Sequence, residues 1–246
     1  MSTCARIRCY DAASVCLREL YFYPTNDADG AMRRIESGET GVEHGVSRQK
    51  FEMLKKQLPG YVHAAPYMLS VFLSINLKRP MFQDDRVRKA LSMAIDRDFI
   101  TKEIYRKGYI PAYALVPPHM PNYEGGARLL WADEPIEARR AEARRLLEAA
   151  GYGPNKPLKF IYSFRNSSDN PRVAVVIQDD WRKIAPWVQV ELRPTEQIHY
   201  ANLRGKDFDV GDGGWVGDFP RRDYVSVPAR NAHAAAELSG LFQPGL

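Results

Sequence analysis

The stretch LKFIYSF at 158–164 opens the part of the chain that decides the fold. Its aromatic and β-branched residues favour a strand. A helical stripe follows, in which the apolar residues share one face: Val173, Ile177, Trp181 and Ile184. VQVEL at 188–192 returns to a strand pattern, 196–204 predicts a short helix, and DFDVGDGGW at 207–215 predicts a last strand that carries glycines. This alternation predicts an α/β lobe, and we expect 158–164, 188–192 and 207–211 to share one sheet.

Residues 68–77, MLSVFLSINL, alternate in polarity as a strand does. We expect the apolar face to lie in the core, and it carries Leu69, Val71, Leu73, Ile75 and Leu77. The opposite face mixes small polar groups with one aromatic ring, and it carries Met68, Ser70, Phe72, Ser74 and Asn76. Two interpretations of this second face stay open, because it could border a cleft or be covered by solvent or a helix.

A helix is predicted over 84–96, where Asp84 and Asp85 suit an N-cap and a first turn. Its apolar stripe is Val87, Ala90, Leu91, Ala94 and Ile95. A capped turn follows, for which the candidate caps are Asp96 and Asp98. We expect Gly108 to end this second segment.

A further helix is predicted over 135–150, with Pro135 in its first turn and Gly151 as its stop. The residues expected to point inward are Ala143, Leu146, Leu147 and Ala150. Within it, the basic stretch ARRAEARR at 138–145 is interrupted by Glu142 and flanked by Glu137 and Glu148, and this helical spacing indicates a salt-bridged outer face.

Residues 19–64 contain short alternating elements that are separated by Pro24, Gly38 and Gly60. We predict strands at 20–23 and 61–64 and helices at 26–35 and 47–57. This segment is interpreted as a partial α/β unit.

The chain has 246 residues with 35 basic against 30 acidic side chains, so its formal charge of +5 is a small excess on a mixed surface. Nucleic acid is therefore not a favoured partner. The opening MSTCARIRCYDAASVC has no apolar run behind its arginines, so we expect no secretory signal peptide. The cysteines Cys4, Cys9 and Cys16 are odd in number and lack a nearby histidine, so we expect free thiols and no metal site.

Carboxylate pairs are the pattern closest to a catalytic one, namely Asp84 with Asp85, Asp179 with Asp180, and Asp209 with Asp212. Neighbouring residues on a helix diverge, and residues three apart in a strand lie on opposite faces. We therefore expect these residues to be caps and solvated groups. Since nucleophile motifs, phosphate loops and dinucleotide fingerprints are also missing from the sequence, we predict no enzyme and no cofactor.

Four blocks resemble, in the same order, the C-terminal lobe of oligopeptide-binding proteins, which are extracytoplasmic solute-binding proteins of family 5 in ABC importers. The blocks are INLKRPMFQDDRVRKALSMAIDR, YRKGYIPAYALVPPHMPNY, ARRAEARRLLEAAGYGPNKPLKFIYSF and GKDFDVGDGGWVGDFP. The resemblance extends over roughly residues 17–220.

The resemblance implies an α/β fold that is type II periplasmic-binding-protein-like. Residues 17–70 would be the remnant of a first lobe, and 71–220 would be the second, C-terminal, peptide-contacting lobe. Residues 1–16 do not resemble the family and are interpreted as a foreign or disordered segment, and 221–246 as a non-family tail. We expect such a pattern in a truncated or frameshifted member.

The resemblance also implies a ligand site around the GW-x-x-D step. The predicted ligand-binding residues are Gly213, Gly214, Trp215, Val216, Gly217, Asp218 and Phe72. In the family, the aspartate binds the ammonium group of the peptide and the tryptophan lines a pocket, which implies these roles for Asp218 and Trp215. The two glycines lack a Cβ, so another backbone can approach closely. From the residues alone, a turn cap at Asp218 and a core ring at Trp215 stay open as alternatives.

Three positions differ from the family pattern. Asp212 stands where some oligopeptide binders carry an arginine for a peptide carboxylate, and it would repel that group. Asn170 and Pro171 stand where a histidine is often found. Arg172 and Arg204 could replace these groups only if they pointed into the cleft, and we expect them to be exposed.

The implied function is that of the substrate-binding component of an ABC transporter that imports oligopeptides or dipeptides. Its partners would be a peptide ligand, a permease and an ATPase, and we expect a monomer. The family implies a periplasmic location, whereas a chain without a signal peptide would stay in the cytoplasm. Two alternatives stay open: a non-functional truncated gene product, and a basic interaction protein that binds an acidic partner.

Overall fold

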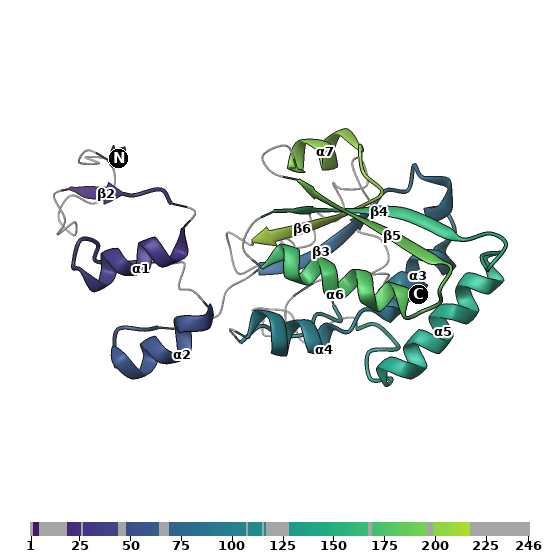
Figure 1. Cartoon of the computed structure of the whole chain (residues 1–246), viewed down its shortest axis with the longest axis horizontal. Helices are drawn as coiled ribbons and strands as arrows, with labels where there is room; N and C mark the ends of the chain where they lie inside the picture. The colour runs from purple at the N-terminus through teal and green to yellow at the C-terminus, as the bar shows by residue number, and fades with distance from the viewer. Residues whose placement is uncertain are drawn as a thin grey trace. The chain divides into compact units, whose positions relative to one another are not determined.

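The computed structural model describes residues 2–4, 19–25, 27–43, 48–63, 69–106, 108–114, 116, 128–166, 169–195 and 199–216. The chain divides into two compact units, Met1–Ala64 and Ala65–Leu246 (Figure 1). Each unit is described by itself. Within the described ranges, the helices are too short or too polar to cross a lipid bilayer.

The first unit pairs β1 (Ser2–Cys4) antiparallel with β2 (Leu20–Phe22) and adds α1 (Ala28–Glu36) and α2 (Arg48–Gln57). Asp27 caps α1, because its side chain accepts a hydrogen bond from the amide of Asp29. The predicted strand at 61–64 is wrong for its described residues, since 61–63 form a turn and irregular backbone after Gly60 adopts a positive φ of 84°.

The second unit contains a four-stranded sheet in the order β3-β6-β4-β5. Its strands are β3 (Leu69–Ile75), β4 (Leu158–Arg165), β5 (Val188–Thr195) and β6 (Val210–Val216). β4 runs parallel to β5 and to β6, whereas β3 runs antiparallel to β6. The prediction of one shared sheet is therefore confirmed.

The last strand begins later than predicted, at Val210 rather than at residue 207. Asn76 explains the difference, because its side-chain amide donates hydrogen bonds to the carbonyls of Lys206 and Phe208. These two carbonyls therefore accept hydrogen bonds from a side chain, and backbone pairing with β3 starts only after them, at Val210. Phe208 itself is buried, so this entry into β6 is fixed by packing as well as by hydrogen bonds.

Helices cover one face of the sheet. These are α3 (Asp85–Ala94), α5 (Ile136–Ala149) and α6 (Asn170–Arg182), whereas the short helix α7 (His199–Gly205) lies on the other side (Figure 1). The Trp181 ring of α6 makes edge contacts with Phe160 and Tyr162 of β4, at centroid distances of 5.2 and 5.5 Å. The expected burial of the helical stripes is confirmed for Val87, Leu91, Ala94, Ile95, Ala143, Leu146, Leu147, Val173, Ile177 and Trp181.

The expected two-faced character of the segment at 68–77 is only partly right. Leu73 and Ile75 are buried, but Val71 from the same face is 41% exposed. Ser74 and Asn76, from the face expected to be polar, are buried as well. Ser70 is buried too, so the first half of β3 is partly covered, and both faces of the strand are buried only from Leu73 onward.

The helix predicted over 84–96 is capped by Asp84, whose side chain accepts from the amide of Arg86, and it ends at Ala94. Asp96 caps the next helical segment, which comprises α4 (Arg97–Phe99) and the π-helix η2 (Ile100–Tyr105). This segment ends at Arg106, whose φ is 57°, and not at Gly108 as predicted.

The helix predicted over 135–150 begins one residue later than expected. Pro135 occupies the N-cap position outside the first turn. Gly151 ends the helix with a φ of 84°, as predicted, because this left-handed conformation suits a residue without a Cβ.

Candidate functional site

The two glycines of β6 face different surroundings. Gly213 pairs with Phe72 in the ladder, and a Cβ built on Gly213 would lie only 2.7 Å from the Phe72 ring. A Cβ on Gly214 would meet Leu69 at 3.4 Å, which is close to ordinary contact. The structure therefore brings together two of the predicted site residues, Phe72 and Gly213, and the ring uses the space that the missing Cβ leaves.

β6 is paired along its whole length on one side only. It pairs with β3 from Val210 to Val216, but with β4 only at Val210 and Gly211. The backbone amide of Asn76 donates a hydrogen bond to the carbonyl of Asp209, and hydrogen-bonded residues alternate along an antiparallel pair of strands. The odd-numbered residues of β6 therefore point their backbone amides and carbonyls toward β3.

The amides and carbonyls of the even-numbered residues therefore point away from β3. In the part of the chain that the structure describes, no strand pairs with that side of β6 beyond Gly211. We call the backbone groups of Gly214 and Val216 on this side the open edge of β6. An unpaired strand edge offers hydrogen bonds to another extended backbone.

Two carboxylates lie at the two ends of the short contact between β4 and β6. Asp209, just before β6, accepts from the amide of Ile161 at 3.0 Å and forms an ion pair with Arg79 at 2.7 Å. Asp212 accepts from the amide of Arg165 at 3.0 Å. Both are therefore structural groups that replace ladder hydrogen bonds where the strands diverge.

Asp212 is fully engaged rather than a free negative charge at the site. Besides the amide of Arg165, its carboxylate accepts from the side-chain amide of Asn170 at 3.0 Å and lies 2.9 Å from Nε2 of His199. The expected repulsion of a peptide carboxylate is thus reduced by three donors. Arg172 and Arg204 are exposed, as expected.

His199 is a site residue that sequence reasoning did not find. It is 1% exposed, and its Nε2 also lies 2.7 Å from the carbonyl oxygen of Asp212. Burial opposes protonation, but the hydrogen bonds and negative charge of Asp212 outweigh it and raise the pKa of His199 above its ordinary value. The two residues are separated by a helix and a turn, so no motif or spacing announces their contact.

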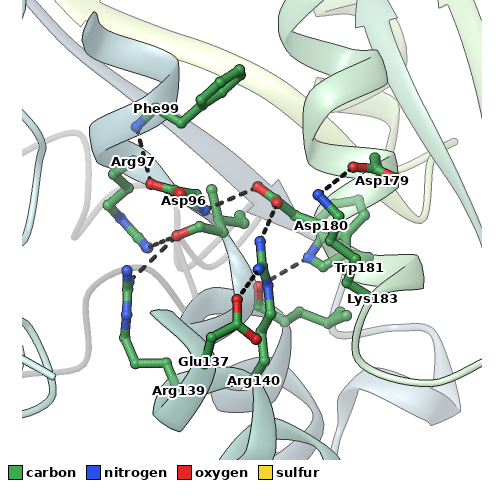
Figure 2. A network of polar contacts seen from close by, with 12 residues as sticks. Asp96, Arg97, Phe99, Glu137, Arg139, Arg140, Asp179, Asp180, Trp181 and Lys183 are labelled. Atoms are coloured by element: carbon green, nitrogen blue, oxygen red, sulfur yellow. Dashed lines mark hydrogen bonds and ion pairs between the residues drawn. The ribbon is translucent and has the colours of Figure 1, made fainter. Parts of the chain in front are cut away.

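The Asp180 carboxylate is buried, although the sequence predicts a cap or a solvated group at this position. Asp180 is 2% exposed, and it accepts from the amide of Asp96 at 2.9 Å and from the guanidinium of Arg140 at 2.6 Å (Figure 2). Burial raises the pKa of Asp180, and the hydrogen bond from Asp96 and the charge of Arg140 act against this rise. Asp179 beside it is exposed and pairs with Lys183, as expected of a solvated residue.

The predicted outer face at 138–145 is also only partly right. Arg144 and Arg145 form exposed pairs with Glu148 and Glu142. Arg139, by contrast, is 3% exposed and lies 5.6 Å from the centre of the Trp131 ring. Arginine stems and guanidinium planes pack well on aromatic rings, so charge alone did not identify the inward positions.

Some predicted residues lie outside the described part of the chain, namely Gly217, Asp218, Cys9 and Cys16. The backbone of Trp215 pairs with Ser70 in the ladder, and Val216 pairs with Leu69. Among the described residues, no group of three or more His, Cys, Asp or Glu side chains could hold a metal ion.

A shallow hollow of about 660 Å³ lies beside β4 and β5. Its lining includes Lys159, Ile161, Gln189, Glu191 and Asp209. None of the predicted site residues lines it. The hollow is therefore not the site that the sequence indicated.

Comparisons with known proteins place the chain in a family. The family described as "Bacterial extracellular solute-binding proteins, family 5 Middle" matches residues 10–235. This range is wider at both ends than residues 17–220, over which the sequence resembles the family. The chain is 31% identical over 215 residues to the periplasmic oligopeptide-binding protein OppA of Salmonella typhimurium, and it spans 39% of that protein. It is 30% identical to the periplasmic murein peptide-binding protein MppA of Escherichia coli, again over 39% of the relative.

A solved structure supports the same assignment. The murein tripeptide binding protein MppA of Escherichia coli aligns with a TM-score of 0.81 and 28% identity, over 92% of this chain and 44% of that one. The expected α/β fold of the periplasmic-binding-protein type is confirmed by this likeness. The relatives are solute-binding proteins and not enzymes, as the sequence predicted. The chain therefore belongs to the bacterial extracellular solute-binding proteins of family 5.

Proposed function

We propose that this chain binds peptides through an α/β lobe, as part of an importer whose permease and ATPase are separate proteins. The observation that carries the proposal is the open edge of β6, where the backbone groups of Gly214 and Val216 that face away from β3 have no strand partner among the described residues. Relatives with the names oligopeptide-binding protein and murein peptide-binding protein support a peptide as the ligand. Both relatives are named as periplasmic proteins, which supports the same location for this chain.

An extended peptide would add to this edge as a further strand. Main-chain hydrogen bonds recognise any peptide backbone, so the sequence of the ligand matters little for this contact. Gly214 helps because it has no side chain that would hold a second backbone away. Trp215 would supply a wall, and Asp218 would bind the ammonium group at the peptide N-terminus.

The lobe would extend over residues 71–220 and act as a monomer. The chain has about two fifths of the length of its curated relatives, so its contacts with a peptide are part of those that a whole relative makes. A site with only part of the contacts still has the full entropic cost of association. We therefore expect weak binding that is measurable with peptide in large excess.

The test is a titration of the full chain with a pool of tri- to pentapeptides, followed by the amide signals of β6 in nuclear magnetic resonance spectra. Gly214→Pro removes an amide from the open edge without removing one from the β3 ladder. Val71→Pro is the matched control, because Val71 faces Gly214 in the register and its amide points to the outer edge of β3.

We expect Gly214→Pro to abolish the peptide response and Val71→Pro to keep it. Equal losses in both variants would mean that the sheet as a whole was damaged and that the open edge has no special role. A response that maps to the first unit would overturn the proposal.

A further inference from the structure

A buried histidine stands where β4 and β6 separate. His199 is the first residue of α7, and its ring touches groups from two strands. Nδ1 lies 2.7 Å from the hydroxyl oxygen of Thr195, at the end of β5. Nε2 lies 2.7 Å from the carbonyl oxygen of Asp212 and 2.9 Å from its carboxylate.

The hydrogen-bond partners determine how many protons the ring carries. The carbonyl and the carboxylate of Asp212 can only accept, so Nε2 must donate. The Thr195 hydroxyl has a single proton and lies 3.0 Å from the carbonyl of Phe164 and 2.7 Å from Nδ1, so when it donates to the carbonyl it must accept from Nδ1. Only the doubly protonated, positively charged ring satisfies all of these contacts at once. A neutral ring would lose one of them.

The surroundings of the ring contain charges of both signs. The titratable and charged groups that act on His199 or on its partner Asp212 come from β4, η2 and α7: Arg165, Tyr162, Tyr105 and Tyr200. Asp169, just before α6, acts on Tyr105. Arg165 opposes protonation of the ring, whereas Asp212 favours it. Asp212 makes direct contact with the ring, so its effect is the larger of the two.

We propose that His199 is a positioning residue for the open edge of β6, as a buried imidazolium that neutralises Asp212 and occupies its carbonyl. This carbonyl is the last backbone acceptor of β6 before the open edge on the side away from β3. His199 therefore fixes the point beyond which an added strand can pair, so that the first available residue is Gly214. The part of this proposal that concerns an added strand rests on the proposed function.

A pH dependence follows from this arrangement. Loss of the ring proton leaves Asp212 with an uncompensated negative charge and breaks a contact to Thr195 or to Asp212. Both changes act at the residue that precedes the open edge, so the edge should bind an added backbone less well at alkaline pH.

The protonation of His199 is tested without any peptide. Ring nitrogen signals of the ¹⁵N-labelled full chain are followed from about pH 5 to about pH 9, the range over which an ordinary histidine loses its proton. His199→Gln identifies the signal by its disappearance, and His63→Gln is the matched control at an exposed histidine. We expect both nitrogens of His199 to stay protonated where an ordinary histidine is largely neutral. A His199 ring that is neutral at pH 7 would overturn the proposal.

Asp212→Asn keeps the shape of the partner and removes its charge. We expect it to weaken proton binding at His199 by about tenfold, which corresponds to one unit of pKa. An unchanged titration would show that Asp212 does not hold the imidazolium, and the proposal would fail. This variant also decides the matter if His199→Gln does not fold.

Peptide binding gives the second measurement. We expect the response of the wild-type chain to weaken roughly five- to tenfold as the ring loses its proton, the scale of one lost hydrogen bond of ordinary strength. His199→Gln should bind weakly at every pH, and His63→Gln should keep the wild-type profile. A wild-type profile that does not change with pH would contradict the positioning role. If no peptide binds at any pH, the proposed function fails, whereas the ring signals still decide the state of His199.

Discussion

At the scale of single residues, the contact between Gly213 and Phe72 decides which side chains β6 can carry. Gly213→Ala would place a Cβ 2.7 Å from the Phe72 ring, so the ring or the strand must move. We expect the free energy of unfolding to fall by about 1–3 kcal/mol, the scale of overpacking in a core. Urea denaturation of the full chain measures the change.

Gly214→Ala is the matched control for this substitution. The new Cβ would meet the flexible end of Leu69 at 3.4 Å, so the expected loss of stability is much smaller. A second substitution, Phe72→Leu, should restore part of the stability of Gly213→Ala because it removes the ring. If both alanine variants behave alike, strand propensity and not the Phe72 ring explains the glycine.

At the scale of elements, the buried ion pair of Asp180 and Arg140 joins two helices that cover the sheet. Arg140→Ala would leave the Asp180 carboxylate buried with the amide of Asp96 as its remaining partner in Figure 2. We expect a loss of about 3–5 kcal/mol in the free energy of unfolding, because a buried charge without its partner is expensive. The measurement is again chemical denaturation.

Arg144→Ala provides the comparison within the same helix. Arg144 pairs with Glu148 at 2.9 Å on the exposed face, and exposed pairs of this kind contribute about 0.5 kcal/mol or less. Similar losses in the two variants would show that helix propensity, and not the buried pair, explains the effect of Arg140→Ala.

The elements also show what the sequence could predict. The cap at Asp84, the stop at Gly151 and the stripe of α6 are local signals, and they located three helices to within a few residues. The strand order and the partners of Asp180 and His199 depend on residues far apart in the chain. Periodicity carries no information about such partners, so it predicts solvated positions for polar residues that in the structure point inward.

The same limit applies to the candidate site. Its glycines and Phe72 were found because a resemblance to known proteins and the lack of a Cβ pointed to them. His199 was missed because its role depends on the separation of β4 from β6. The register of the sheet, which creates the open edge, became visible only in the structure.

At the scale of the whole molecule, the proposed function assigns to Asp218 the binding of the ammonium group at the peptide N-terminus. Because the expected binding is weak, Asp218→Asn should reduce the response to free peptides to below detection, since it removes the charge that would bind the ammonium group. Peptides with an acetylated N-terminus should be little affected, because they carry no ammonium group. Asp207→Asn, at an exposed aspartate, is the matched control. Equal losses for free and acetylated peptides would show that Asp218 acts as a structural cap.

The most direct test of the account is hydrogen exchange at the backbone amides of Gly214 and Val216, with and without a saturating tripeptide. These amides face away from β3, so in the free chain they should exchange faster than those of Gly213 and Trp215. If a peptide adds to the open edge of β6, exchange at Gly214 and Val216 should slow markedly when peptide is present. Unchanged exchange at these two amides, together with slower exchange elsewhere in the chain, would contradict the account.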